Sequence, residues 1–183
     1  MKSYTTGPET TRLNHRAFTL DDASEFFALN GNPDVMQLTG EPVLTSLDAA
    51  REAIANYSDF DDLGFGRWAC ILKQTRTIIG FCGLKYLPEL DAVDVGYRFH
   101  PEYWGHGFAT EACAASLDFG FETICLDKIL GFVLPKNVAS IRVLEKVGMQ
   151  PDGEVMYDGL LALRFVKRAS RICEPADARE PPT

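Results

Sequence analysis

The sequence lacks the features that mark a membrane protein, a secreted protein or a nucleic-acid binder. No stretch approaches the about 18 apolar residues of a membrane span, and residues 1–11 contain no apolar run of a signal peptide. The 18 Lys and Arg residues are outnumbered by 26 Asp and Glu residues, so the formal net charge is −8. General binding to nucleic acid needs clustered basic residues. We therefore expect neither a nucleic acid nor a membrane as a partner.

Cysteine and histidine are too few and too scattered to predict a metal site. The five cysteines are an odd number without CxxC spacing, and His15, His100 and His106 show no metal-ligand spacing. Four of the cysteines lie in apolar stretches, where a free thiol behaves as a small apolar group. A reducing compartment fits this pattern best, so the sequence predicts a cytoplasmic protein.

The chain does contain enough apolar residues for one folded domain. Of its 183 residues, 46% are hydrophobic, and we predict a single domain at 11–170. A polar tail is expected at 1–10 and a Pro-rich, disordered tail at 171–183. Hydrophobic periodicity and turn residues predict strands at 12–18, 66–73, 77–86, 93–99, 128–134, 149–157 and 160–169, and helices at 21–30, 46–57, 107–121 and 137–147.

One loop between a strand and a helix has the features of an anion site. The strand at 93–99 is followed by Gly105-His106-Gly107 and then by a helix. Glycines let successive N–H groups point at one spot, and the helix N-terminus adds its positive dipole end. The alternative is an ordinary turn, since Gly-x-Gly alone is weak. Thr110 replaces the third glycine of a dinucleotide motif, and no P-loop is present.

A second element follows the next strand along the chain. Asn137-Val138-Ala139-Ser140 opens the helix at 137–147. Asn137 is a good helix N-cap, and that is its structural alternative to a role in binding. A glycine loop after one strand and Asn-x-x-Ser after the next are harder to explain by capping alone.

Together these motifs resemble the GNAT superfamily of acetyl-CoA-dependent N-acetyltransferases, most closely its RimJ/RimL branch, which acetylates ribosomal-protein N-termini and other amines. The resemblance runs from TRLNHRAFTLDDASEFFALNGNPDV to FVLPKNVASIRVLEKVGMQPDG. It implies an α+β fold with a mixed, mostly antiparallel sheet of six or seven strands flanked by about four helices. The strands before Gly105 and Asn137 should lie side by side and splay apart to admit acetyl-CoA.

The resemblance also implies residues that bind acetyl-CoA, the acyl donor and the one cofactor expected. The backbone of three strand residues should pair with the pantetheine arm like an added strand: Tyr97, Arg98 and Phe99. The loop that should hold the pyrophosphate comprises Gly105, His106, Gly107, Phe108, Ala109 and Thr110. Asn137 should hydrogen-bond the pantetheine, and Ser140 should lie near the sulfur.

Two residues depart from the broader superfamily pattern. Trp104 stands where many members have Arg or Gln, so one charged or amide contact with the donor is missing, although Trp is common there in the RimJ/RimL branch. Leu144 stands where many members keep a Tyr as the general acid for the thiolate. Glu111 needs no role in binding, since a carboxylate in a first helical turn is stabilised by the helix dipole.

The expected reaction is attack of a neutral amine on a thioester. At pH 7 only about one in 2,500 Lys-like amines is neutral, against about one in ten α-amines. Asp94 is the candidate base; its alternative is an exposed carboxylate on a strand. Ser140 is the candidate hydrogen-bond donor to the leaving thiolate; its alternative is a helix residue that bonds back to the main chain.

Three functions remain open from the sequence. The first is acetylation of a protein or peptide N-terminal α-amine, and the second is acetylation of a small amine such as a polyamine, an amino sugar or a toxin. The net charge suits a cationic acceptor in either case. The third is a CoA-binding module without catalysis. We expect the acceptor pocket at residues 21–59 and 152–160, with Phe26, Phe27, Tyr57, Phe60, Met156 and Tyr157. A homodimer is also left open.

Overall fold

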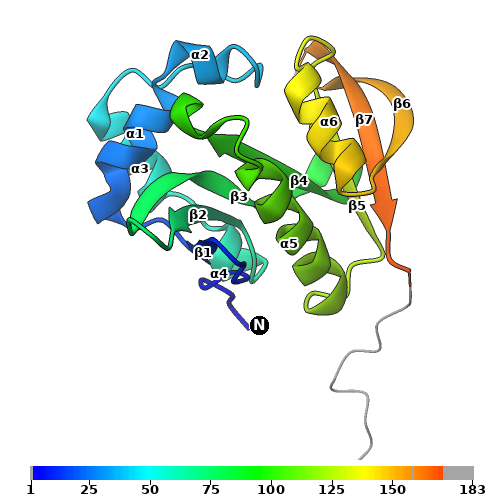
Figure 1. Cartoon of the computed structure of the whole chain (residues 1–183), viewed down its shortest axis with the longest axis horizontal. Coiled ribbons are helices and arrows are strands. Elements are labelled where there is room, and N and C mark those ends of the chain that lie inside the picture. The colour runs from blue at the N-terminus through cyan, green and yellow to red at the C-terminus, as the bar shows by residue number, and fades with distance from the viewer. Residues whose placement is uncertain (1, 158, 171–183) are drawn as a thin grey trace, which may run out of the picture.

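A seven-stranded sheet runs through the molecule in the order β1-β2-β3-β4-β5-β7-β6 (Figure 1). The computed structural model describes residues 2–157 and 159–170, so the predicted tail at 171–183 and Asp158 of the last hairpin lie outside them. The strands are β1 (Leu13–Arg16), β2 (Arg67–Leu72), β3 (Thr77–Leu87), β4 (Ala92–Phe99), β5 (Lys128–Val133), β6 (Gln150–Tyr157) and β7 (Leu160–Arg168). Neighbouring strands are antiparallel except β4 and β5, which are parallel. The predicted mixed, mostly antiparallel sheet is confirmed.

The helices are α1 (Ala23–Asn30), α2 (Pro33–Met36), α3 (Leu47–Ala55), α4 (Asp59–Asp62), α5 (Phe108–Glu122) and α6 (Val138–Lys146). The four predicted helices correspond to α1, α3, α5 and α6. The single-turn helices α2 and α4 were not predicted, because four residues are too few to show a helical period. Ser46 caps α3 as predicted, since its side chain accepts a hydrogen bond from Ala49 N.

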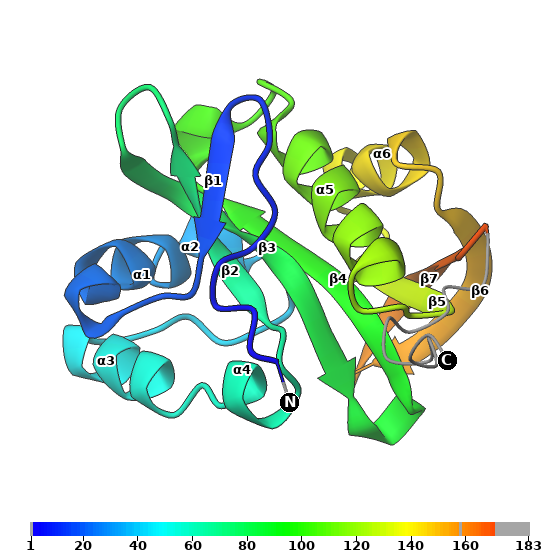
Figure 2. The same cartoon turned by 90° about the horizontal axis from the view of Figure 1, so that it is seen from below.

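Helices cover both faces of the sheet, and the side chains of β4 point alternately to one face and the other. Figure 2 shows α1 and α3 on one side of the sheet and α5 and α6 on the other. Val93, Val95 and Phe99 belong to the main hydrophobic core, which also includes residues of α5. Side chains of a strand alternate between faces, so Asp94 and Arg98 point to the opposite side.

The sheet opens between β4 and β5. These strands share a single register pair, Asp94 with Leu130, although both continue beyond it. Within residues 2–157 and 159–170, the part of β4 after Asp94 is therefore paired with β3 on one edge and with no strand on the other. This confirms that the two strands lie side by side and splay apart.

The segment before residue 11 is docked on the sheet. Tyr4 N donates to Gly64 O at 2.7 Å, and the Trp68 indole donates to Tyr4 O at 2.8 Å. Thr6 forms an isolated bridge with Arg16. This part of the predicted tail therefore packs against the strands that it precedes.

The cysteines do not form one class. Cys70, Cys82 and Cys113 are buried free thiols, as expected for small apolar groups. Cys125 is disulfide-bonded. The expectation of free thiols, on which the predicted reducing compartment rests, is therefore wrong for this residue. In residues 2–157 and 159–170, no helix combines the length and the apolar character needed to cross a bilayer.

Candidate functional site

The glycine loop has the backbone geometry of an anion site. Gly105 and Gly107 have φ of +78° and +81°, a left-handed conformation that favours glycine. A side chain added at Gly105 would meet nothing within 4 Å, so the loop is open on that side. Helix α5 begins at Phe108, and the first N–H groups of a helix have no partner within it. These donors and the helix dipole fit a phosphate or pyrophosphate.

Arg12 brings a positive charge to this loop from the start of the chain. Its Nη1 donates to His106 O at 2.9 Å, and its guanidinium lies 4.2 Å from the centre of the Phe108 ring. Glu111 accepts from Arg12 Nε at 2.6 Å and also from Thr10. Glu111 therefore ties the N-terminal segment to α5, a role beyond the dipole effect expected from the sequence. No pattern in the sequence pointed to Arg12.

Trp104 takes a different part from the Arg or Gln that it replaces. Its indole Nε1 donates to Phe99 O at 2.7 Å. Of the three residues predicted to pair with pantetheine, Phe99 thus has its carbonyl already occupied. Tyr97 and Arg98 also lie beyond the last β4–β5 pair, where β4 has no strand partner on that side among the residues that the structure describes.

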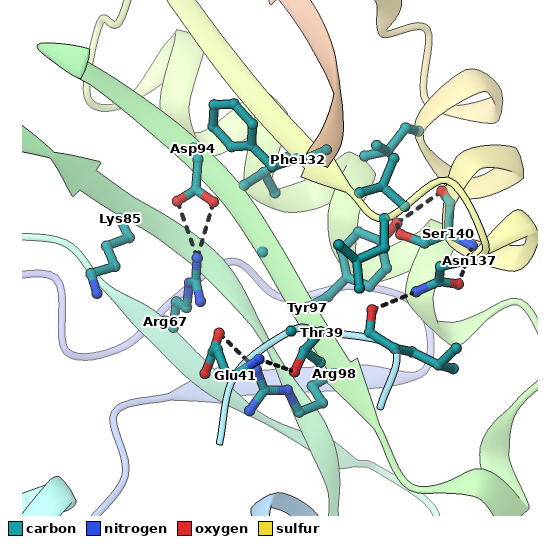
Figure 3. A pocket seen from close by; sticks show the side chains of 18 of the residues that line it. Thr39, Glu41, Arg67, Lys85, Asp94, Tyr97, Arg98, Phe132, Asn137 and Ser140 are labelled. Carbon is teal, nitrogen blue, oxygen red and sulfur yellow. Dashed lines mark hydrogen bonds and ion pairs between the residues drawn. The ribbon is translucent and has the colours of Figure 1, made fainter. Parts of the chain in front are cut away.

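Asn137, Ser140 and Tyr97 come together at the opening between β4 and β5 (Figure 3). Asn137 Oδ1 accepts from Ser140 N at 3.1 Å, so Asn137 is a helix cap, and its Nδ2 donates to Leu38 O at 3.2 Å. Ser140 Oγ lies 2.8 Å from the Tyr97 hydroxyl rather than bonding back to its own helix. Burial raises the pKa of Tyr97, so this hydroxyl remains protonated. Leu144 lines the same pocket.

Asp94 is buried and paired, so the alternative of an exposed strand carboxylate is wrong. It is 6% exposed, and Arg67 Nη2 donates to its two oxygens at 3.1 and 3.0 Å. Burial raises the pKa of Asp94, although the charge of Arg67 acts in the opposite direction. The carboxylate is therefore a stronger base than an exposed aspartate.

Arg67 can reach Asp94 because residue 96 is glycine. A Cβ at Gly96 would lie 2.6 Å from Arg67 Cζ, so the guanidinium rests directly on the backbone of β4. The sequence analysis missed Arg67. The available signal was a charged residue that begins an otherwise apolar strand.

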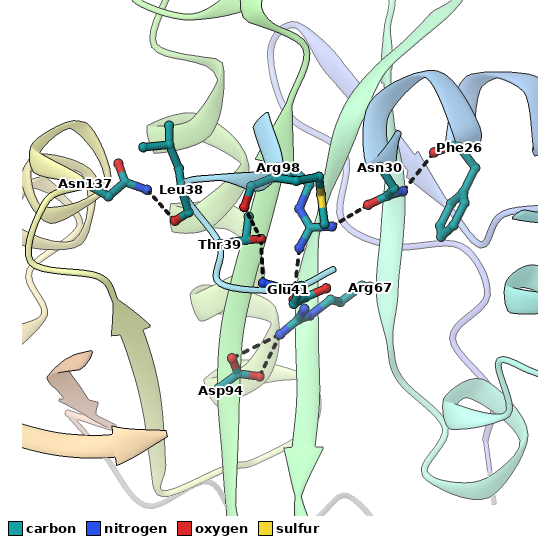
Figure 4. A network of polar contacts seen from close by, with 10 residues as sticks. Phe26, Asn30, Leu38, Thr39, Glu41, Arg67, Asp94, Arg98 and Asn137 are labelled. Atoms are coloured by element: carbon teal, nitrogen blue, oxygen red, sulfur yellow. Dashed lines mark hydrogen bonds and ion pairs between the residues drawn. The ribbon is translucent and has the colours of Figure 1, made fainter. Parts of the chain in front are cut away.

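Arg98 and Glu41 extend this charged network toward α1 (Figure 4). Arg98 Nη2 lies 2.9 Å from Glu41 Oε1, and Arg98 Nη1 donates to Asn30 Oδ1. Lys85 lines the same pocket. Three cations, Arg67, Arg98 and Lys85, therefore lie around two carboxylates, Glu41 and Asp94. The local charge of this site is thus positive, although the net charge of the whole chain is negative. The sequence assigned Arg98 only a backbone role.

Two pockets meet at this network. The first, of about 160 Å³, lies at the β4–β5 opening and is lined by residues of both strands, including Asp94 of β4, and by Ser140 of α6. The second, of about 320 Å³, lies beside α1, α3 and α4. Both pockets are lined by Glu41, Arg67, Phe81 and Arg98.

The predicted acceptor residues are divided between these pockets and the surface. Phe26, Tyr57 and Phe60 line the second pocket, and Leu160 lines the first. Phe27 lines neither of the two pockets, and Met156 is 66% exposed. The side chain of Tyr157 lies outside the described part of the chain.

Comparisons with known proteins agree on one family. The family model described as "Acetyltransferase (GNAT) domain" matches residues 12–150. The uncharacterized N-acetyltransferase p20 of Bacillus licheniformis is 31% identical over 146 residues, which is 79% of this chain and 82% of that protein. Spermidine N(1)-acetyltransferase of Escherichia coli is 32% identical over 95 residues, half of each chain. The crystal structure of a GNAT-family acetyltransferase from Bacillus anthracis superimposes with a TM-score of 0.75 at 26% identity, and covers 88% of this chain and 97% of that one.

Proposed function

The chain belongs to the GNAT acetyltransferase family, and from this premise we propose that it transfers the acetyl group of acetyl-CoA to a primary α-amine. Membership of the family supports the activity of an acyl-CoA-dependent N-acetyltransferase. The observation that supports the finer proposal is the first pocket, where Asp94 from β4 and Ser140 from α6 line one space. The anion loop lies just beyond the end of the same strand, β4.

Acetyl-CoA fits the opening from the loop inward. Its pyrophosphate would bind the N–H groups of residues 105–110, with Arg12 as the nearby cation. Its pantetheine arm would run along the free edge of Tyr97 and Arg98 and reach Asn137. For Asn137 to bind the arm, its amide must exchange Leu38 O for a ligand carbonyl.

The proposed chemistry uses one base and one hydrogen-bond donor. The neutral amine attacks the thioester carbonyl carbon, a C–N bond forms and the C–S bond breaks. Asp94 accepts the proton lost by the amine, directly or through water. Ser140 donates a hydrogen bond to the departing sulfur, and the buried Tyr97 hydroxyl, 2.8 Å away, supports it. Tyr97 thus provides a hydroxyl although Leu144 replaces the usual tyrosine.

An α-amine suits this site because it demands little of the base. About one α-amine in ten is already neutral at pH 7, against about one Lys-like amine in 2,500. The resemblance to the RimJ/RimL branch favours a protein or peptide N-terminus. The second candidate is a polyamine, favoured by the 32% identity to spermidine N(1)-acetyltransferase over half of the chain. The cytoplasmic location and a homodimer stay predictions of the sequence.

The experiment measures thiol release from acetyl-CoA with four kinds of acceptor: a peptide with a free N-terminus, the same peptide N-blocked but carrying Lys, spermidine and free amino acids. We expect turnover of α-amines and little turnover of the blocked peptide. Asp94→Asn should remove turnover but retain acetyl-CoA binding by calorimetry, whereas Asp34→Asn, an exposed carboxylate on α2, should change neither. Preference for spermidine or for the blocked peptide would reject the α-amine. Binding of acetyl-CoA without release for any acceptor would indicate a non-catalytic module.

A further inference from the structure

The second pocket lies away from the glycine loop and Asn137, and it is lined by Arg67, the partner of the proposed base Asp94. It has twice the volume of the first pocket and is lined by five aromatic rings: Phe18, Phe26, Tyr57, Phe60 and Phe81. A cavity of about 150 Å³ is enough to hold a benzene ring, so about 320 Å³ holds a large apolar side chain with room to spare. An apolar cavity with a few polar groups at one end is typical of a small-molecule site.

The polar end of this pocket is lined by two guanidinium groups, those of Arg67 and Arg98. Arg98 is 8% exposed, and its Nε is buried without a partner among the described residues. Arg67 Nε is in the same condition. Both Nε atoms are shielded from the pocket, so an acceptor oxygen from a ligand would be bound by the Nη atoms of the two guanidinium groups. Arginine donors match a carboxylate especially well.

A carboxylate from the protein already occupies part of this place. Glu41 lies on the exposed segment between α2 and α3, its side chain is 50% exposed, and it is 2.9 Å from Arg98 Nη2. It stands where a ligand carboxylate could bind. Withdrawal of this side chain into solvent would leave Arg98 free for a carboxylate brought by the acceptor.

The Arg67–Asp94 pair presents a positive and a negative group side by side, which complements the carboxylate and the amine of an α-amino acid. Its guanidinium and carboxylate are in direct contact at 3.0 Å, and the amine and carboxylate of an α-amino acid are separated by one carbon. An amine directed at Asp94 would therefore place its own carboxylate beside the arginines. A peptide N-terminus has no carboxylate at that carbon, and Arg67, Arg98 and Lys85 would repel the additional cations of a polyamine.

We propose that the acceptor is a free α-amino acid with a large apolar side chain. This inference rests on the proposed acetyl transfer to an α-amine. The carboxylate is held by Arg67 and Arg98 after Glu41 is displaced, the amine faces Asp94 and the thioester, and the aromatic pocket receives the side chain. The product is the N-acetyl amino acid, with CoA released as the thiol.

The first experiment compares L-phenylalanine, L-phenylalaninamide and glycine as acceptors for the wild-type protein. The amide keeps the α-amine and the ring but has no carboxylate. We expect its kcat/KM to be lower than that of L-phenylalanine by about tenfold or more, the effect of losing hydrogen bonds to a charged group. Glycine should also be poor, because it leaves the pocket empty.

Three variants test the two contacts separately. Glu41→Gln removes the competing carboxylate and should lower the KM for L-phenylalanine by about two- to fivefold, the range for an exposed ion pair, with no such gain for the amide. Ala53→Phe places a ring in the aromatic pocket and should remove the preference for L-phenylalanine over glycine. Ala55→Phe is its matched control, since Ala55 lies on the same helix and does not line the pocket.

The outcomes separate this inference from the activity on which it depends. Equal turnover of L-phenylalanine and its amide, or better turnover of a peptide or spermidine, overturns the amino-acid acceptor and leaves the N-acetyltransferase in place. Loss of the phenylalanine preference in both alanine variants overturns the role of the pocket. Absence of thiol release with every amine, while acetyl-CoA binds, overturns both proposals.

Discussion

Replacing Tyr97 by phenylalanine removes one oxygen atom from the pocket and leaves the ring in place. That oxygen lies 2.8 Å from Ser140 Oγ and 3.2 Å from Ser140 O. Burial raises the pKa of Tyr97, so the hydroxyl is protonated at any assay pH and can orient and polarise the serine. If Ser140 donates to the departing sulfur, the effect of the tyrosine on catalysis must pass through this serine.

The sizes of the two effects follow from this order. Ser140 is proposed to contact developing charge, and a hydrogen bond to a charged group contributes about 1.5–3 kcal/mol, so Ser140→Ala should lower kcat by about 10- to 100-fold. Tyr97 makes a hydrogen bond between neutral groups, which contributes about 0.5–1.5 kcal/mol, so Tyr97→Phe should lower kcat by about 2- to 10-fold. Neither variant should weaken acetyl-CoA binding as much as it slows turnover.

The assay is a double-mutant cycle on kcat, measured by thiol release, with binding of acetyl-CoA measured by calorimetry. We expect Tyr97→Phe to have little further effect once Ser140 is alanine. Ser24→Ala, on the exposed side of α1, is the control for loss of a serine hydroxyl. An equal effect of Tyr97→Phe in both backgrounds, or an effect on acetyl-CoA affinity alone, would refute the relay from tyrosine to serine.

Three further predictions concern charges around the pocket and the sheet. Arg12→Gln should weaken acetyl-CoA binding by about tenfold in calorimetry, because it removes a cation beside the loop; Arg51→Gln, at an exposed pair on α3, should not. Gly96→Ala should lower kcat/KM by about tenfold or more while the circular dichroism spectrum is retained, since the new Cβ displaces the Arg67 guanidinium from its place 2.6 Å away. Burial raises the pKa of Asp22, but hydrogen bonds from Arg16 and Thr19 lower it by more than burial raises it. The pKa of Asp22 is therefore lower in the folded than in the unfolded protein. The stabilising contribution of Asp22 is therefore complete above the unfolded pKa and is lost as the pH falls through the folded one, so Asp22→Asn should cost about 1–3 kcal/mol in urea unfolding at pH 7 and progressively less at pH 3.

The positions of the strands along the chain and of the glycine loop could be predicted because local sequence determines them. Apolar alternation identifies β4, and the glycines after it have few uses other than a left-handed turn. Asn137 was identified as a possible cap from its position before a helix, and the structure confirms that cap. Each of these features depends on residues that are neighbours in the chain.

The charged network could not be predicted in the same way, because its members meet only in the folded chain. Arg67 and Asp94 are 27 positions apart, and Arg98 and Asn30 are 68 apart. Asp94 was predicted as the base, but its partner is an arginine that reaches it across Gly96 from another strand. Arg12 reaches the loop over a separation of 94 positions. Hydrophobic periodicity contains no information about such pairings.

The single register pair between β4 and β5 separates two parts of the sheet that are also two contiguous parts of the chain. Residues up to Phe99 contribute the first four strands and the groups proposed to face the acceptor, Arg67 and Asp94, whereas the chain from Lys128 contributes the last three strands and, in α6, Ser140. Because one register pair crosses this seam, recombination within α5 would break few backbone hydrogen bonds. A chimera with its crossover there would combine the groups proposed to face the acceptor in one relative with the serine proposed for the departing thiolate in another.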